Sequence, residues 1–328
     1  MFLITGGAGF IGSNLAAALE KRGESEIIVC DWLEDGDKWR NLAKRELADI
    51  VPPEDLFEFL EDNADVIDTV FHMGAISSTT ETDADLVIET NFSLSLALWE
   101  WCRQENARFI YASSAATYGD GSAGFNDDSS PEAMARLQPL NVYGWSKHLF
   151  DRRVLRMATE PENCPPQWAG LKFFNVYGPN EEHKDGMKSV AAQVFPFAKE
   201  GKPFRLFKSH HPDYADGGQL RDFIWVGDCV DAMMWLLDNS EVNGLFNLGT
   251  GKARSFADLA GAVYTALGKK PQIDYIDTPE ELRDKYQYFT QADMTRLRDA
   301  GYERPFTSLE DGVESYVRDF LDTPDPYK

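Results

Sequence analysis

The sequence is poor in cysteine, in basic residues and in long apolar runs. Its four cysteines are widely spaced and form no C-x-x-C pair, so we predict neither a zinc site nor a disulfide framework, and expect reduced thiols as in cytoplasmic proteins. There are 32 Lys and Arg against 55 Asp and Glu, a net charge of -23, which argues against a nucleic-acid or anionic-membrane partner. No stretch approaches the roughly 20 apolar residues of a spanning helix, so we expect no membrane anchor and no export signal.

What the chain does have is a regular alternation of apolar strands and helices. Continuous apolar runs at Phe2–Thr5 and Ile27–Cys30 flank a segment with leucine and alanine at helical spacing. The same order returns with runs at 66–72 and 108–112 on either side of a helical stripe. Continuous apolar strands are buried on both faces, as in parallel sheets. The sequence therefore predicts an α/β fold, a Rossmann-type doubly wound parallel sheet.

The second half of the chain is less regular and predicts a smaller lobe. Further strands are expected at 171–175 and 245–248, and a strand with its helix at 223–237. We predict a dinucleotide-binding Rossmann domain of residues 1–174 plus about 222–250, and a smaller mixed α/β substrate lobe of about 175–221 plus 251–328. Ligands of such sheets bind at the carboxyl ends of the strands, where we expect this lobe to lie.

A glycine-rich turn, TGGAGFIG at 5–12, joins the first strand to the first helix. Gly7, Gly9 and Gly12 form a G-x-G-x-x-G pattern, and Gly6 adds an overlapping one. Glycines allow a tight turn and close backbone approach, and the helix N-terminus offers unpaired N–H groups to a pyrophosphate. Glycines alone are also typical of a purely structural turn, but between a strand and a helix they predict a dinucleotide site.

The choice between NAD and NADP depends on residues that follow the second strand. Asp31 ends that strand 22 residues after Gly9, where a carboxylate accepts hydrogen bonds from the ribose hydroxyls of NAD. Lys38 and Arg40 come next and can pair with a 2′-phosphate, or simply lie in solvent. The pattern alone leaves both cofactors open.

Tyr143 and Lys147 are four residues apart in YGWSK and share one helical face if a helix begins near Asn141. A phenol with a pKa near ~10 is a poor base at neutral pH, and an adjacent ammonium stabilises its phenolate. Ser114 follows the 108–112 strand and can hydrogen-bond a substrate oxygen at the carboxyl edge of the sheet. We therefore predict that Ser114, Tyr143 and Lys147 are catalytic.

The glycine turn, ASSAATYG at 112–119 and Y-x-x-x-K resemble the extended short-chain dehydrogenase/reductase superfamily. Within it, segments at 72–83, 141–151, 173–190 and 285–302, including HKDGM and YQYFTQAD, are similar to ADP-glycero-manno-heptose 6-epimerases over nearly the whole chain. The resemblance implies a cytoplasmic isomerase that epimerises carbon 6 of the heptose in ADP-D-glycero-D-manno-heptose. It implies hydride transfer to and from bound NADP, with NAD as the alternative, and a role in lipopolysaccharide inner-core synthesis.

The same resemblance implies roles for individual residues and no metal. Tyr143 and Lys184 are then the two acid/base groups, beside Lys147 and Ser114. The cofactor contacts that it implies are Gly6, Gly9, Phe10, Ile11, Gly12, Asp31, Trp32, Lys38, Met73, Gly74, Ala75, Ile76, Ser77, Asn91, Tyr143, Lys147, Val176 and Lys184. The substrate contacts that it implies are Ser114, Asn175, Gln193, Phe207, Lys208, Ser209, His210, Arg221 and Tyr286. The family forms rings of five, so a homo-oligomer is expected.

Other functions of the same fold remain alternatives. Ala115 and Ala116 cannot donate a proton, which argues against a 4,6-dehydratase. A UDP-hexose 4-epimerase or a reductase would use the same Ser114, Tyr143 and Lys147, although that epimerase family lacks HKDGM. A non-catalytic NADP-binding regulator is disfavoured because both Tyr143 and Lys147 are present.

The acidic net charge is compatible with a phosphorylated ligand if the site is a local exception. Seven basic residues lie on the lobe expected to cover the substrate: Lys184, Lys188, Lys199, Lys202, Arg205, Lys208 and Arg221. Backbone N–H groups, which the net charge does not count, hold a dinucleotide pyrophosphate. We therefore expect an electropositive site within an acidic surface.

Overall fold

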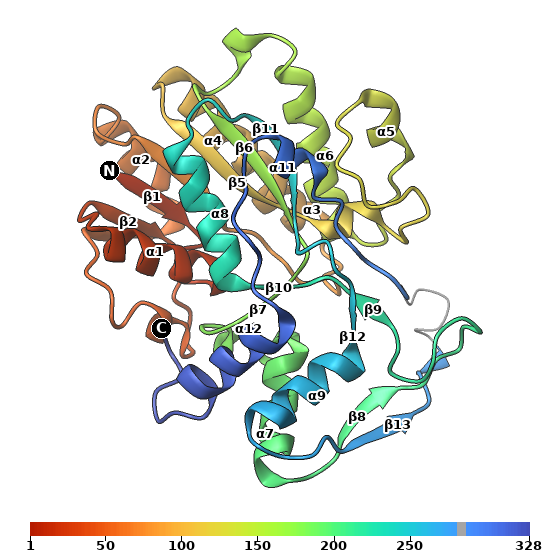
Figure 1. The fold of residues 1–328 in the computed structure, drawn as a ribbon. Helices are drawn as coiled ribbons and strands as arrows, with labels where there is room; N and C mark the ends of the chain where they lie inside the picture. The colour runs from red at the N-terminus through yellow and green to blue at the C-terminus, as the bar shows by residue number, and fades with distance from the viewer. Residues whose placement is uncertain (281–286) are drawn as a thin grey trace.

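The computed structural model describes residues 1–280 and 287–328, and its centre is a seven-stranded sheet (Figure 1). The strand order is β11-β6-β5-β4-β1-β2-β3, and all neighbouring strands are parallel. The strands are β1 (Phe2–Thr5), β2 (Ile27–Cys30), β3 (Asp49–Val51), β4 (Thr69–His72), β5 (Arg108–Ser114), β6 (Trp168–Phe173) and β11 (Gly244–Leu248). The predicted Rossmann-type parallel sheet is confirmed.

Helices cover both faces of this sheet, because alternate strand residues point to opposite sides. In β1, Ile4 packs into one apolar cluster, and Leu3 packs into another on the opposite face. The helices on the Ile4 side are α1 (Phe10–Arg22), α8 (Val226–Asp238) and α11 (Thr295–Asp299). Those on the Leu3 side are α2 (Leu56–Asp62), α4 (Leu94–Gln104) and α6 (Val142–Met157). The sheet is therefore doubly wound, as its continuous apolar strands predict.

A second group of elements lies below the main sheet in Figure 1 and has a core of its own, with Ala191, Leu259 and Val313 in it. Its helices are α7 (Val190–Glu200), α9 (Phe256–Ala266) and α12 (Leu309–Tyr316). Three two-stranded sheets accompany them: β7 (Asn175–Tyr177) with β10 (Phe223–Trp225), β9 (Leu220–Arg221) with β12 (Arg254–Ser255), and β8 (Phe204–Phe207) with β13 (Ile273–Ile276). The predicted domain boundaries stay a prediction; α11 packs on the main sheet instead of joining this group.

Three strands differ from the sequence prediction. The strand expected at 171–175 is divided, since β6 ends at Phe173 and Asn175 begins β7, which pairs with β10. β4 begins at Thr69 because the N–H of Val66 closes a turn with the Asn63 carbonyl. β3 was not predicted: it is a three-residue edge strand with two exposed residues, and so presents no apolar run.

Short helical segments make most of the remaining connections: α3 (Ala84–Ile88), α5 (Pro131–Arg136), η1 (Lys38–Asn41), η2 (Pro53–Asp55), η3 (Glu89–Ser93), η4 (Ala115–Tyr118), η5 (Pro161–Asn163), η6 (Glu182–Met187) and η7 (Val317–Leu321). Two of them, η4 and η6, carry or adjoin predicted catalytic residues. Within the described ranges, every helix falls short of the length and apolarity that crossing a membrane requires.

Candidate active site

The glycine turn brings backbone close to backbone and leaves the start of α1 open. Gly9 is the N-cap of α1 and has no side chain to occupy the helix end. A Cβ at Gly12 would lie 2.3 Å from the Gly6 oxygen. Gly6 itself has a φ of +65°, and a Cβ there would lie 2.5 Å from the Gly74 backbone. Glycine is therefore required at both positions, and the first-turn N–H groups of α1 are placed to hold a pyrophosphate.

Asp31 and Lys38 form the adenosine-side end of the predicted cofactor site. The Ala8 N–H donates to Asp31 Oδ2 at 3.0 Å, and Lys38 Nζ donates to Asp31 Oδ1 at 2.8 Å. Burial raises the pKa of Asp31, and the hydrogen bond from Lys38 opposes that rise. A carboxylate here suits ribose hydroxyls and the ammonium suits a 2′-phosphate, so the residues fit either nicotinamide dinucleotide. Nearby, Trp32 is exposed and Arg40 lies over the Tyr327 ring at 5.4 Å.

The predicted cofactor residues of 73–77 form the loop that leaves β4 beside the glycine turn. Asn91, in η3, accepts from the Ile76 N–H at 2.8 Å and donates to the Ile76 carbonyl at 2.9 Å. Its amide also donates to Ser146 Oγ at 3.0 Å, on α6. Asn91 therefore joins this loop to the helix that carries Tyr143.

Tyr143 and Lys147 stand one turn apart on α6, next to the end of β5. Asn141 Oδ1 accepts from the Gly144 N–H at 2.8 Å and caps the helix, which begins near Asn141 as expected. A Cβ at Gly144 would lie 2.7 Å from the Ala116 oxygen, so glycine lets α6 approach η4 closely. Ser114 directly precedes η4 and hydrogen-bonds the Tyr143 phenol. The structure thus brings the three predicted catalytic side chains to one place.

Burial controls the protonation of this centre. Loss of hydration lowers the pKa of Lys147 to about 8, so the ammonium form still predominates at neutral pH. Burial raises the pKa of Tyr143 and outweighs the opposing hydrogen bond from Ser114. Burial therefore favours the protonated phenol, and positive charge beside Tyr143 is what would favour its phenolate.

Lys184 reaches the dinucleotide site from the η6 segment. Its Nζ lies 5.3 Å from the centre of the Phe10 ring, in the first turn of α1. Burial lowers the pKa of Lys184, and the charge of Glu181 opposes this shift. A lysine that loses its proton more readily than usual can act as an acid or a base.

The segment that carries Lys184 is attached through the fully buried Glu181. One carboxylate oxygen of Glu181 accepts from Ser189 Oγ at 2.5 Å and from Tyr316 OH at 2.9 Å, and the other accepts from the Ser189 N–H. Asp185 has φ 47° and ψ -122°, a backbone conformation that side chains other than glycine rarely adopt. Glu182, two residues before Lys184, forms an ion pair with Lys188 at 2.6 Å.

Three predicted substrate residues lie on elements beside the main sheet, namely β7, α7 and β9. Asn175 begins β7 directly beyond β6. Gln193 Nε2 donates to the Lys188 carbonyl at 2.7 Å and to the Gly186 carbonyl at 3.4 Å, and so contacts the η6 segment. Arg221, in β9, lies over the Phe256 ring at 5.4 Å. Val176, the last predicted cofactor residue, lies in β7 against the core of the main sheet.

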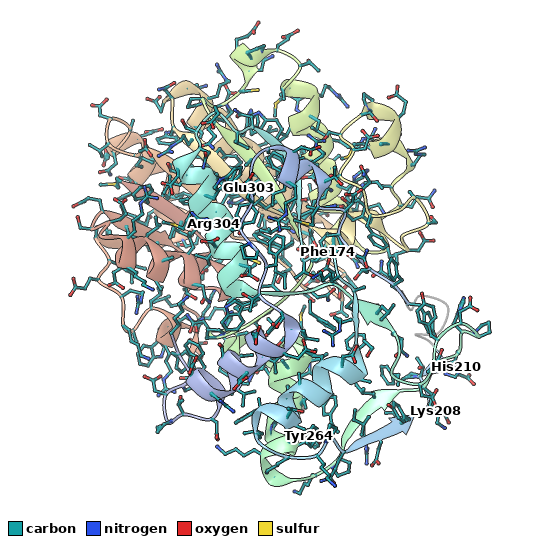
Figure 2. The ribbon with its side chains drawn as sticks, viewed as in Figure 1. Phe174, Lys208, His210, Tyr264, Glu303 and Arg304 are labelled. Carbon is teal, nitrogen blue, oxygen red and sulfur yellow. The ribbon has the colours of Figure 1, made fainter. Side chains whose placement is uncertain are left out.

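The other predicted substrate residues lie farther out. Figure 2 shows Lys208 and His210 at the outer edge of the molecule, while Phe174 lies near its centre. These two belong to the loop after β8, with Phe207 ending the strand and Ser209 Oγ donating to the His211 carbonyl. Tyr286 lies outside the described residues.

Most of the predicted basic group is paired with nearby carboxylates. Ion pairs join Lys188 to Glu182, Lys199 to Asp322, Lys202 to Glu200 and Lys208 to Asp277. Local acidic residues therefore offset much of this charge, and Lys184 is the member of the group that contacts the glycine turn.

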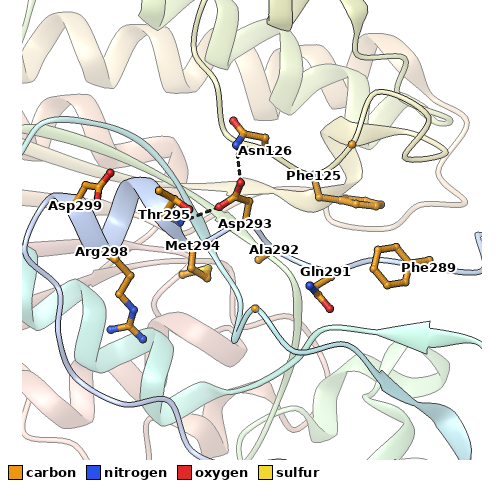
Figure 3. A pocket seen from close by; sticks show the side chains of 12 residues that line it. Phe125, Asn126, Phe289, Gln291, Ala292, Asp293, Met294, Thr295, Arg298 and Asp299 are labelled. Atoms are coloured by element: carbon orange, nitrogen blue, oxygen red, sulfur yellow. Dashed lines mark hydrogen bonds between the residues drawn. The ribbon is translucent and has the colours of Figure 1, made fainter.

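A surface pocket of about 720 Å³ lies elsewhere, between the 124–126 loop and the 289–299 segment (Figure 3). Asn126 Nδ2 donates to Asp293 Oδ2 at 2.7 Å across its rim. No predicted catalytic, cofactor or substrate residue among those described lines it. It is therefore a separate depression. Among the described residues, no cluster of His, Cys, Asp and Glu could hold a metal ion.

Comparison with known proteins gives the family. Residues 2–249 match the NAD dependent epimerase/dehydratase family. The chain belongs to this family. A protein from Nitratidesulfovibrio vulgaris, named ADP-L-glycero-D-manno-heptose-6-epimerase, is 52% identical over 100% of both chains. One of the same name from Fusobacterium nucleatum is 47% identical over 100% of both. The predicted resemblance to these epimerases is confirmed, as is the prediction of an isomerase.

Solved structures agree in fold. The ADP-L-glycero-D-manno-heptose-6-epimerase of Helicobacter pylori is 30% identical with a TM-score of 0.78, covering 98% of this chain and 96% of its own. The UDP-glucose 4-epimerase of Thermus thermophilus, solved with NAD, is 27% identical with a TM-score of 0.75, covering 95% and 96%. A nicotinamide dinucleotide is thus the cofactor class of this family.

Sequence reasoning did not identify three buried charged residues that support the catalytic ones. Asp151 and Lys172 form a fully buried ion pair at 2.7 Å, and Glu181 anchors the Lys184 segment. One signal was present for Asp151, which continues the four-residue spacing of Tyr143 and Lys147 along α6.

Proposed function

We propose that the chain epimerises carbon 6 of the heptose in ADP-D-glycero-D-manno-heptose, giving ADP-L-glycero-D-manno-heptose through a 6-keto intermediate. The observation that carries the proposal is Lys184, a half-buried lysine against the dinucleotide turn and separate from Tyr143. Inversion requires a hydride and a proton to leave one epimer and to return so that the other epimer forms. Two proton-transfer groups can serve this reaction, one for each epimer. The names and full-length similarity of the relatives support the same substrate.

The side chains have distinct roles in this reaction. Ser114 hydrogen-bonds the substrate oxygen, and Tyr143 exchanges a proton with it when one epimer is bound. Lys147 stabilises the phenolate of Tyr143 from the next turn of α6. Lys184 exchanges the proton when the sugar binds in the other orientation. When bound, the nicotinamide supplies the hydride acceptor and donor, and its oxidised form brings positive charge that favours the phenolate.

NADP is the cofactor that we propose, with NAD as the alternative. The Lys38 ammonium lies 2.8 Å from Asp31 Oδ1, and so reduces the repulsion that this carboxylate would exert on a 2′-phosphate. Mass spectrometry of the nucleotide released from denatured protein distinguishes the two cofactors directly. Release of NAD alone contradicts the NADP preference and leaves the reaction untouched.

The substrate is tested by incubating purified protein with ADP-D-glycero-D-manno-heptose and separating the two epimers by chromatography. We expect an equilibrium mixture from either starting epimer. Parallel incubations with UDP-glucose test a 4-epimerase. Turnover of UDP-glucose alone would favour that enzyme, and a protein that holds the cofactor but turns over neither sugar would favour a regulator.

The cellular setting follows from this reaction as a proposal. We propose a cytoplasmic enzyme that supplies the heptose precursor of the lipopolysaccharide inner core and acts as a homo-oligomer, with a ring of five expected. The two-lobe division, with substrate held between the lobes, belongs to the same proposal, which includes no nucleic-acid or membrane partner. Light scattering on the purified protein gives the mass of the assembly, and a monomer would contradict the oligomer.

A further inference from the structure

A buried polar network lies beneath the Tyr143 centre. The Asp151 carboxylate, on α6, accepts hydrogen bonds from three groups: Tyr111 OH at 3.0 Å, Ser113 Oγ at 2.7 Å and Lys172 Nζ at 2.7 Å. Asp151 has no solvent exposure and Lys172 has almost none. Burying two charges costs solvation energy that apolar residues of similar size would not lose. The fold alone does not require an ion pair at this place.

The network connects the elements that carry the catalytic residues. Tyr143, Lys147 and Asp151 follow one another at four-residue intervals on α6, and so share one face. Ser113, which donates to Asp151, directly precedes Ser114 in β5.

Lys172 extends the network to η4 on the other side of Ser114. Its Nζ donates to Thr117 Oγ1 at 2.7 Å, and that hydroxyl donates to the Ser114 carbonyl at 2.8 Å. The same ammonium lies 5.1 Å from the centre of the Tyr118 ring. The backbone of Ser114 is thus held from both sides by side chains that converge on one ion pair.

We propose that Asp151 and Lys172 are positioning residues for the reaction, which fix Ser114 against Tyr143 and Lys147 and set the balance of charge behind them. This inference rests on the proposed function, since it concerns the same reaction. Asp151 touches neither substrate nor cofactor in this arrangement, because its carboxylate is fully enclosed by its partners. It acts through the residues that it holds.

Electrostatics give the network a measurable sign. The charge of Asp151 raises the pKa of both Tyr143 and Lys147. It adds to the rise that burial causes at Tyr143 and opposes the lowering that burial causes at Lys147. The titratable and polar groups that face Asp151 are Tyr111 and Ser113 from β5, Tyr118 from η4, Lys172 from β6, and Tyr143, Lys147 and His148 from α6 itself. Lys172 is the cation paired directly with it. Removing the Asp151 charge should therefore lower the pKa of Tyr143, and removing the Lys172 charge should raise it.

The test compares Asp151→Asn with Lys172→Met in the cofactor-loaded protein. Asp151→Asn removes a negative charge, so the acid limb of kcat/KM, set by Tyr143, should move to lower pH by about half a unit. Lys172→Met leaves the Asp151 charge uncompensated, so the limb should move to higher pH. We expect kcat to fall about tenfold in each, with KM little changed. Arg152→Gln, on the exposed side of α6, is the matched control and should alter neither.

Loss of activity with the limb unmoved in both variants, or moved in the same direction, would overturn the proposal. If a single variant fails to fold, the double variant avoids an unpaired buried charge. Its limb should lie close to that of the wild type while its kcat stays reduced. A double variant with wild-type kcat would equally overturn the positioning role.

A second measurement separates this proposal from the proposed function. Tyrosinate absorbance, taken as the difference between each protein and its Tyr143→Phe counterpart, reports the Tyr143 titration without substrate. Opposite shifts in the two variants support the network even if ADP-heptose is not turned over. Turnover by the wild type without such shifts supports the reaction and contradicts the network.

Discussion

Tyr143 and Lys184, the two proton-transfer groups of the proposed reaction, are held in different ways. Tyr143 stands on α6, a helix of 16 residues whose Asp151 is bonded to two strands of the main sheet. Lys184 stands on the six-residue η6 segment, which is held by the buried carboxylate of Glu181 and by a hydrogen bond between Asn41 and His183. Tyr143 thus stands on a helix packed against the main sheet, and Lys184 stands on a short connection beside it.

This difference in support suggests a difference in function. Tyr143 must keep its geometry with Ser114 and the cofactor in both directions of the reaction, which a helix packed on a parallel sheet provides. The Lys184 segment contains the strained backbone of Asp185 and lies outside any regular α-helix or strand. In the proposed reaction the sugar binds in two orientations, and we expect the Lys184 segment to be the part of the site that adjusts to them.

The largest expected effect on kcat comes from replacing Tyr143, on the helix packed against the sheet. Tyr143→Phe removes the hydroxyl that exchanges the proton but keeps the ring, so kcat should fall about 10³-fold. Bound cofactor should be retained, because the glycine turn is untouched. Epimer separation measures the rate, and absorbance of the released nucleotide measures the cofactor.

Tyr275→Phe is the matched control, since Tyr275 lies exposed on β13. It should have wild-type activity. Near-normal turnover by Tyr143→Phe would mean that another group exchanges the proton, and the comparison between the two centres would fail.

Replacing the second group should cost less. Lys184→Met keeps the aliphatic stem over Phe10 and removes the ammonium, so we expect kcat to fall about 10²-fold with the cofactor retained. Lys199→Met is the control, because Lys199 is exposed in a surface ion pair with Asp322. Equal activity of the two lysine variants would remove Lys184 from the reaction.

The anchor of the Lys184 segment gives a smaller effect with a definite sign. Glu181 raises the pKa of Lys184 against the lowering caused by burial, so Glu181→Gln should lower that pKa further. The lysine then loses its proton at lower pH, and the basic limb of the kcat/KM profile should move to lower pH. We expect an approximately tenfold loss of kcat and about 1–3 kcal/mol lower unfolding free energy.

Glu182→Gln, next in sequence and half-buried, is the control for this variant. Its pH profile should match that of the wild type. A basic limb that moves to higher pH in Glu181→Gln, or that stays in place, would show that Glu181 does not act on Lys184.

The main sheet and the helix that carries Tyr143 are also the parts that the sequence predicts well. Strands at Phe2–Thr5 and Ile27–Cys30 match β1 and β2 residue for residue, because burial on both faces requires an unbroken apolar run. The Asn141 cap, which places Tyr143 and Lys147 on one face, follows from local chemistry. Features that depend on neighbouring residues alone can be predicted from the chain.

Features that depend on distant partners cannot. Lys172 lies within an apolar strand, and its burial is explained by Asp151, 21 residues earlier, and by Thr117. Glu181 stands in a run of charged residues typical of a solvated loop, yet Tyr316 buries it from 135 residues away. The break after Phe173 likewise depends on β10, which draws Asn175 into a second sheet. Each depends on a tertiary contact between residues far apart in the sequence, which local residue patterns do not predict.

The smallest expected effect tests whether the Lys184 segment stores strain. Asp185 has φ 47° and ψ -122°, which glycine adopts freely, so Asp185→Gly should raise the unfolding free energy by about 1 kcal/mol despite the extra freedom of its unfolded chain. Denaturant unfolding measures this, with Asp185→Ala as the control that should gain nothing. If strain holds Lys184 in place, the glycine variant becomes more stable and less active together. A variant that is more stable at unchanged kcat would show that the strain at Asp185 does not position the lysine.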